Sequence, residues 1–291
     1  MLPDRRRLHL QDGPIDLVLE AFGEVCEIEV AYHAAAARFV GVLDELCREL
    51  EVLRRPTCAN SDFPSGVVAR RMMAAVKPYA SQSFITPMAA VAGAVAEEIL
   101  EAMICNAKVS RAYVNDGGDI ALHLEPGEAF VVGMVEHPDK ASLFGTTTIR
   151  ATDPIRGIAT SGWRGRSFSL GIADAVTVLA DTAARADAAA TIVANAVDLP
   201  GHPGIKRVRA VDLAPDNDLG TRRVTQSVGE LAPGEIRDAL DAGIRVAESL
   251  RSLGLIRAAA LNLQGETLVV GAKSWPHRVE ISAPDRSLAH A

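Results

Sequence analysis

A short segment in the middle of the chain gathers side chains whose types and spacing suit a polar, phosphorylated ligand. Thr160, Ser161 and Gly162 follow an apolar, strand-like run, so a glycine permits close backbone approach and two hydroxyl groups can meet the ligand. Arg164 and Arg166 come next, and their planar guanidinium groups suit phosphate or carboxylate. This segment is therefore interpreted as one wall of a candidate ligand site.

Asp187 and Thr191 stand four residues apart in an alanine-rich helical pattern. Residues at this spacing share a helix face, so a carboxylate and a hydroxyl can be aimed at one point. Oxygen ligands of this kind suit a hard cation such as magnesium. The alternative is a structural acid, because a carboxylate buried among alanines needs a hydrogen-bonding partner.

A second candidate lies in the run Asn115, Asp116, Gly117, Gly118 and Asp119, between two strand-like segments. Asp-Gly in this position is a strong signal for a β-hairpin turn. The same turn could also face a ligand, with glycine amides as donors and Asn115 or Asp119 contacting its polar edges. Both interpretations stay open at this point.

The surrounding pattern must supply the strands and helices that position these groups. Hairpin strands are expected at 8–10 and 15–20, helices at 35–53, 87–104, 182–197 and 234–253, and further strands at 112–115, 120–124, 130–135, 146–150, 157–161, 206–211, 258–263 and 267–270. Hairpins with interspersed helices favour an α+β fold over strict βαβ alternation. No linker separates two halves, so residues 1–291 are expected to form one compact domain, with two intertwined halves left open.

Composition narrows the class of protein. The chain has 291 residues, of which 48% are hydrophobic and 23% charged, an ordinary globular composition. A net charge of −7 argues against binding to nucleic acid or to an acidic membrane, which rests on basic surfaces. The N-terminal segment lacks the apolar stretch of a secretory signal, and no apolar run is long enough to span a bilayer. We therefore expect a cytoplasmic protein.

The four cysteines are spread along the chain without a CxxC pair, at Cys26, Cys47, Cys58 and Cys105. This spacing suggests neither a zinc ribbon nor a redox dithiol. They are expected to be buried free thiols.

Taken together, three motifs resemble those of the ApbE-type FAD:protein FMN transferases, which use magnesium and FAD to attach FMN to a threonine or serine of a target protein. The family's GGD turn, T-S-G segment and A-D-x-x-x-T helix correspond, in the same order, to Gly117-Gly118-Asp119, Thr160-Ser161-Gly162, and Ala186-Asp187 with Thr191. Over nearly its full length the chain resembles even more closely a branch of the ApbE-like superfamily that lies apart from the proven transferases.

The resemblance implies an ApbE-like α+β fold of duplicated, T-fold-like antiparallel sheets packed with helices. It implies a protein that binds FAD, FMN or a similar phosphorylated ligand, with Asp187 and Thr191 holding magnesium. The residues expected to line the ligand pocket are Asn115, Gly117, Gly118, Asp119, Thr160, Ser161, Gly162, Arg164 and Arg166. A protein acceptor or a second copy of the chain is left open as a further partner.

Two departures from the transferase pattern bear on activity. The family's lysine is missing from the stretch corresponding to 91–93, and its histidine is missing from the stretch corresponding to 167–174. Three interpretations follow: a ligand-binding protein with divergent FMN transfer, a non-catalytic protein serving assembly or partner recognition, or an enzyme for another small anionic substrate. The third would use Ser167, Ser169 or Asp174 in place of the histidine.

Overall fold

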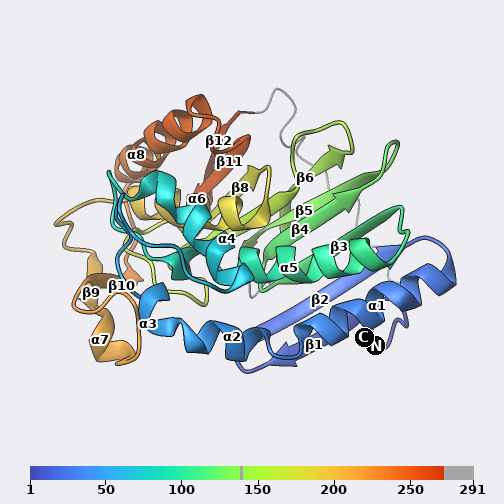
Figure 1. The fold of residues 1–291 in the computed structure, drawn as a ribbon. Coiled ribbons are helices and arrows are strands. Elements are labelled where there is room, and N and C mark those ends of the chain that lie inside the picture. Colours follow the sequence, from blue (N-terminus) through green and yellow to red (C-terminus); the bar gives the residue numbers. More distant parts are fainter. Residues whose placement is uncertain (138–139, 272–291) are drawn as a thin grey trace.

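A single eight-stranded antiparallel sheet runs through the protein (Figure 1), in a computed structural model that describes residues 1–137 and 140–271. The strands lie in the order β1-β2-β3-β4-β7-β8-β11-β12. Their bounds are Leu8–Asp12 (β1), Ile15–Phe22 (β2), Arg111–Asp116 (β3), Asp119–Leu124 (β4), Gly157–Ser161 (β7), Ala175–Ala180 (β8), Ala258–Leu263 (β11) and Glu266–Val270 (β12). Every pairing among the described strands is antiparallel, which confirms the predicted α+β class and excludes a doubly wound parallel sheet.

Most of the helices cover one face of this sheet. The helices of the described part are α1 (Val25–Phe39), α2 (Val42–Arg48), α3 (Leu50–Leu53), α4 (Val67–Val76), α5 (Val91–Asn106), α6 (Ala183–Ala196), α7 (Ala210–Leu213) and α8 (Pro233–Ser252), with short 3₁₀ turns η1 (Lys77–Tyr79) and η2 (Pro87–Ala90). Alternate strand residues such as Val114, Ala121 and Val178 join helix residues such as Ile99 and Val193 in the main core. This follows from the two-residue period of a strand, which presents every second side chain to the helices.

Two small sheets flank the main one. β5 (Ala129–His137) and β6 (Lys140–Arg150) form a hairpin, in which Phe130 packs edge-on against Phe22 and Tyr113 at centroid distances of 6.0 and 5.9 Å. β9 (Ile205–Arg209) and β10 (Arg223–Val228) form a second hairpin, which stands with α7 at one end of the molecule in Figure 1.

The main sheet repeats one arrangement twice. The first half supplies β1, β2, α1, α5, β3 and β4, and the second supplies β7, β8, α6, α8, β11 and β12 in the same order. This is the duplicated arrangement that the resemblance implied. The antiparallel register opposes Leu17 to Asp116 and Ile120 to Ile158, so the β1–β2, β3–β4, β7–β8 and β11–β12 connections lie at one end of the sheet. Residues 272–291, the last part of the predicted single domain, lie outside the described residues.

Several expected elements differ in extent. The predicted helix 35–53 is three helices. Gly41 adopts a left-handed φ of +91° between α1 and α2, and Glu49, at φ −111° and ψ 9°, separates α2 from α3. The first of the three begins earlier than expected, at Val25. The expected strand 206–211 ends at Arg209, where α7 begins. Four elements had no sequence-based prediction, namely α4, η1, β8 and β10, and α7 was not predicted as a helix.

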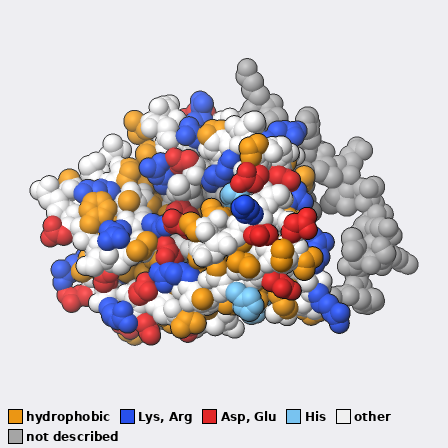
Figure 2. Space-filling view, turned by 45° about the vertical axis from the view of Figure 1, so that its right-hand side comes forward, with side chains coloured by type: hydrophobic (Ala, Val, Ile, Leu, Met, Phe, Trp, Pro, Cys, Tyr) orange, Lys and Arg blue, Asp and Glu red, His pale blue; other side chains and the backbone are white. Residues whose placement is uncertain are grey.

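The surface mixes charges of both signs, with lysines and arginines beside acidic side chains across the face in Figure 2. The four cysteines are free, as predicted, but the expectation of burial is wrong, since all four are exposed on helices or loops. Within residues 1–137 and 140–271, no helix combines the length and apolarity needed to cross a bilayer.

Candidate functional site

The run from Asn115 to Asp119 forms the two-residue turn between β3 and β4. Gly117 and Gly118 have φ values of +61° and +116°, which favour glycine over residues with a Cβ. The Oδ1 atom of Asn115 accepts a hydrogen bond from the Gly118 amide at 2.8 Å. The hairpin interpretation is therefore correct, and the side-chain Oδ1 atom of Asn115 stabilises the turn.

Asp119 begins β4 and projects toward the helices, two residues before the core residue Ala121. Its Oδ1 atom accepts a hydrogen bond from the Thr160 amide on the neighbouring strand β7, at 3.2 Å. Ser161 shares the helix-facing side with the core residue Ala159, whereas the Thr160 hydroxyl turns to the other side and bonds the Thr177 hydroxyl at 2.9 Å. Two of the predicted motifs thus meet at Asp119, although the two hydroxyls of the T-S-G segment face opposite sides.

Gly162 has a packing role. A Cβ at this position would lie 2.4 Å from the carbonyl oxygen of Asp174, so only glycine fits without displacement of the backbone. The close approach predicted for this glycine therefore exists, and its partner is the protein's own chain.

Asp187 lies in the first turns of α6 and reaches the start of α5. Its Oδ2 atom accepts a hydrogen bond from the Gly93 amide at 3.1 Å. In return, Glu97 on α5 accepts the Ala184 amide at the start of α6, at 2.7 Å. Each acid satisfies an amide that has no partner within its own helix, and the positive end of the helix dipole favours its charge.

The two helix starts approach closely because Gly93 has no side chain. A Cβ there would lie 2.4 Å from the carbonyl oxygen of Ala183. Gly93 belongs to the stretch where the transferases carry their lysine, so this stretch supplies a backbone donor to Asp187 instead.

Three acids of this region have raised pKa values. Burial is the main cause for Asp119, whose pKa rises to about 7, and the negative charge of Asp116 adds to it. Burial also raises the pKa of Asp116 to about 7, while the positive charge of Arg166 opposes the shift. Burial and then the charge of Asp119 raise the pKa of Asp187 well above its usual value of 3.8, against the effect of the Gly93 and Ala92 amides.

Asp119 and Asp187 are only half-buried, although loss of hydration dominates both pKa shifts. A carboxylate can meet both conditions when protein surrounds most of it and solvent reaches one side. Both acids are therefore partly open to solvent, whereas Asp116 is almost completely enclosed, at 6% exposure.

This arrangement suits a cation whose remaining ligands come from a bound substrate rather than from the protein. Within the described part of the chain, no three His, Cys, Asp or Glu side chains gather to hold a metal. Magnesium is commonly bound through one or two carboxylates together with substrate phosphates, so Asp119 and Asp187 suit it in that mode. Thr191 lies one turn beyond Asp187 on the same helix face and is half-buried.

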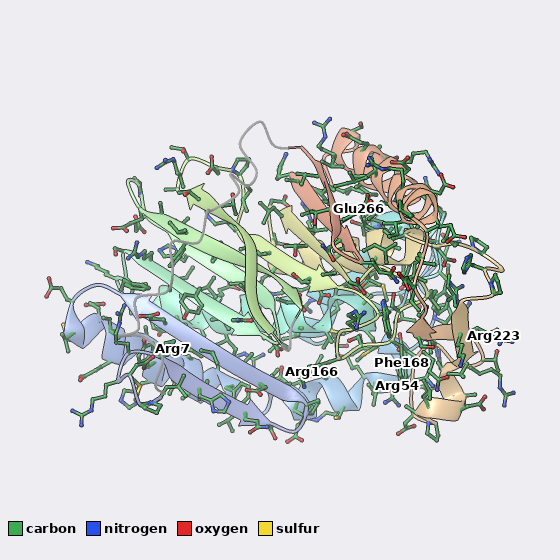
Figure 3. All side chains as sticks on the ribbon, turned by 180° about the vertical axis from the view of Figure 1, so that it is seen from behind. Arg7, Arg54, Arg166, Phe168, Arg223 and Glu266 are labelled. Atoms are coloured by element: carbon green, nitrogen blue, oxygen red, sulfur yellow. The ribbon has the colours of Figure 1, made fainter. Side chains whose placement is uncertain are left out.

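The two predicted arginines have different partners. Arg166 lies over the β3–β4 turn, with one terminal nitrogen 3.4 Å from the place of a Cβ on Gly117 and the other 3.3 Å from the carbonyl oxygen of Pro14. Figure 3 shows it beside the end of the β1–β2 hairpin. Arg164 instead donates its Nε–H to Asp174 at 2.6 Å and stacks on Trp163. Arg166 thus joins the turn, and Arg164 joins a separate cluster around Asp174.

Asp174, at the centre of this cluster, is one of three residues that the sequence offered as substitutes for the missing histidine, together with Ser167 and Ser169. The Asp174 side chain is 2% exposed and also accepts hydrogen bonds from Trp163 Nε1 at 3.0 Å and from the Gln264 amide at 2.7 Å. Ser169 is buried and contacts Asn195 and the Gly171 amide. Both residues have structural partners, while Ser167 is exposed.

Three residues of the site are absent from the pocket lining expected from the sequence: Asp116, Gly93 and Glu97. A signal existed for Asp116, because two acids bracket the two glycines of the turn. The small residues at the start of α5 permit close packing, but the sequence does not identify the partner. Nothing in the local pattern connects Glu97 to the start of α6.

Comparisons with known proteins agree with the resemblance drawn from the motifs. The model of a family described as "AbpE bacteria" matches residues 1–269. A UPF0280 protein of Methanococcoides burtonii is 37% identical over 184 residues, covering 62% of this chain and 72% of the relative. A second, from Methanothermobacter thermautotrophicus, is 36% identical over 201 residues, covering 66% and 74%. The match to a UPF0280 protein of Methanopyrus kandleri spans 48% of that relative.

A structural comparison gives a more distant likeness. The crystal structure of Pseudomonas stutzeri flavinyl transferase ApbE, in its apo form, matches with a TM-score of 0.45 and 12% identity, covering 92% of this chain and 94% of that chain.

Proposed function

The chain belongs to the family described as "AbpE bacteria" and is similar to archaeal UPF0280 proteins. From this premise we propose that it binds a flavin nucleotide, FAD or FMN, or a similar phosphorylated ligand, with magnesium. One observation supports the proposal: Asp119 and Asp187, from opposite halves of the fold, are both partly open to solvent, and they lie close enough for the charge of Asp119 to raise the pKa of Asp187. Magnesium would supply positive charge that offsets both carboxylates and the phosphate oxygens of the ligand.

The other residues have roles consistent with a bound phosphate. Ser161 faces the same side of the sheet as Asp119, and its hydroxyl can donate to a phosphate oxygen. Thr191 extends the oxygen-bearing face of α6 beyond Asp187. Arg166 places a positive charge at the neighbouring turn, where it opposes the rise in the pKa of Asp116.

The proposed activity is ligand binding, and FMN transfer is a separate question. The transferases' lysine and histidine have no counterparts here, and the nearby Ser169 and Asp174 are engaged in structural hydrogen bonds. Handling of the acceptor proton would therefore need another group. Release of FMN from FAD in the presence of magnesium would reveal such chemistry.

The rival proposal is a non-catalytic protein that uses this region for assembly or partner recognition. It is favoured by the close packing of Gly93 on Ala183 and by the capping bond to Asp187, which give the small residues and the acid structural roles. The partial solvent exposure of Asp119 and Asp187 favours the ligand-binding proposal instead.

Chemical denaturation with FAD, FMN or inorganic pyrophosphate, each with and without magnesium, tests the proposal. A ligand selective for the folded state raises the free energy of unfolding by about 2.7 kcal/mol at a hundredfold excess over its dissociation constant. We expect stabilisation that requires magnesium and is lost in Asp119→Asn. The exposed Asp238→Asn on α8 serves as a charge-matched control and should behave like wild type. Absence of stabilisation by all three probes would contradict the proposal.

A further inference from the structure

A hollow of about 260 Å³ lies at the C-terminal end of α6, where α6 meets α8 and the loop before η2. Leu170, Ile192, Ala196 and Val246 give it apolar walls, and Asn195 provides a polar group. Pockets for whole drug-sized ligands are commonly about 300–1,000 Å³, so this hollow suits one flat portion of a larger molecule.

The Asn195 amide has a fixed orientation. Its Oδ1 atom accepts the Leu170 backbone amide at 2.9 Å and contacts the Ser169 hydroxyl at 3.3 Å. A backbone N–H can only donate, so the oxygen must face Leu170, and the Nδ2 group remains as the donor. A ligand beside Asn195 is therefore recognised best by a hydrogen-bond acceptor on its edge.

The hollow continues the polar face of α6. Asp187, Thr191 and Asn195 follow one another at intervals of four residues, so their side chains form a stripe that winds slowly round the helix. Eight residues of helix correspond to about 12 Å between Asp187 and Asn195. A nucleotide is long enough to have its phosphates near the first residue and a ring near the last.

An aromatic ring and a positive charge adjoin the hollow. Phe84 lines it, and the Arg222 guanidinium lies 3.2 Å from the centroid of the Phe84 ring. This stacking restrains Phe84 and places a cation near the hollow, which favours an anionic ligand over a cationic one.

We propose that this hollow is the ring subsite of the nucleotide site: it receives a planar heterocycle, and the Asn195 Nδ2 group donates to an acceptor atom on the ring edge. The inference rests on the proposed function, because the phosphates of the same ligand are assigned to Asp119 and Asp187. Isoalloxazine and adenine both carry such acceptors, so the shared chemistry is a flat, acceptor-bearing heterocycle.

Substitutions that fill the hollow distinguish the contribution of the ring to binding from that of the phosphates. Ala196→Phe places a benzyl group in it from α6, and Val246→Phe does so independently from α8. Ala37→Phe, at an exposed position of α1, is the control for added aromatic bulk. Dissociation constants are measured by calorimetry for FMN, ADP and inorganic pyrophosphate, all with magnesium, on proteins whose folding is checked by circular dichroism.

We expect both filling variants to weaken the binding of FMN or ADP by about tenfold or more. Their affinity for pyrophosphate should stay within about twofold of wild type. If only FMN binding is weakened, the hollow receives isoalloxazine, and if only ADP binding is weakened, it receives adenine. Unchanged affinity for both nucleotides, with pyrophosphate still bound, would overturn the ring subsite while the proposed function stands. Failure of wild-type protein to bind any of the three probes would overturn both.

Discussion

The carboxylate of Asp187 on α6 accepts the Gly93 amide at the start of α5, at 3.1 Å. The residue selected from the sequence as a cation ligand is thus also the cap of a neighbouring helix. The two roles are compatible, because a carboxylate offers about four lone-pair sites and one amide occupies one of them. Removing the whole side chain would therefore affect packing and ligand binding together, and a subtler substitution is needed to separate them.

Asp187→Asn makes that separation. The amide oxygen can still accept the Gly93 N–H, so we expect the free energy of unfolding without magnesium at pH 8 to equal or exceed that of wild type. Magnesium-dependent binding of pyrophosphate should fall by about tenfold or more, since the charge is lost. Asp187→Ala should additionally lose the cap, at a cost of about 0.5–2 kcal/mol.

Urea denaturation and calorimetry on the two variants check this expectation. If Asp187→Asn is destabilised yet binds pyrophosphate as wild type does, Asp187 is a structural acid and the cation assignment fails.

The raised pKa values of Asp116 and Asp119 predict a falling pH profile of stability without magnesium. Each rises from 3.8 to about 7, so the folded protein binds more protons than the unfolded chain within that window. Stability is then highest below the window and falls as pH rises through it, with an upper limit of about 1.4 kcal/mol per pH unit for each group. The half-buried Asp119 should contribute less than this limit because solvent screens it.

Magnesium should restore stability mainly above pH 7, where the acids are ionised. Denaturation at pH 5 and pH 8, with and without magnesium, measures both effects, and Asp119→Asn should flatten the profile. An equal magnesium increment at the two pH values would count against a cation held by these acids.

Local motifs predicted the parts of the site that are contiguous in sequence. The β3–β4 turn follows from two glycines between acids, and the Asp187–Thr191 face follows from helical spacing. The small residues at the start of α5 permit close approach, and Gly93 packs on Ala183 in this way.

Contacts between distant segments could not be predicted in this way. Gly93 and Asp187 are 94 residues apart, and their bond depends on how both halves pack on one sheet. Likewise, the Arg164 side chain has the chemistry to bind phosphate, but in the structure it pairs with the buried carboxylate of Asp174 on the same loop. Five of the six residues of β8 are apolar, with Thr177 as the exception, and this nearly continuous apolar run gives no period that distinguishes a strand from a helix.

Gly93→Ala tests the close meeting of α5 and α6. The added Cβ would lie 2.4 Å from the Ala183 carbonyl oxygen, so the helices must move apart and the bond to Asp187 must lengthen. We expect a loss of about 1–3 kcal/mol in the free energy of unfolding. Gly234→Ala in α8 is the matched control, because its Cβ would meet nothing within 4 Å. Equal stability of the two variants would show that α5 and α6 are not tightly packed here.

Asp174→Ala tests whether the Arg164 cluster serves the fold rather than the ligand. The buried carboxylate accepts hydrogen bonds from Trp163, Arg164 and the Gln264 amide, and so joins the β7–β8 connection to the β11–β12 turn. Its removal leaves the Trp163 and Gln264 donors without this partner, and we expect a loss of about 1–3 kcal/mol or more. Magnesium-dependent pyrophosphate affinity, measured below the denaturation midpoint, should change by less than about threefold. A stable variant that loses pyrophosphate binding would instead place Arg164 and Asp174 in the ligand site.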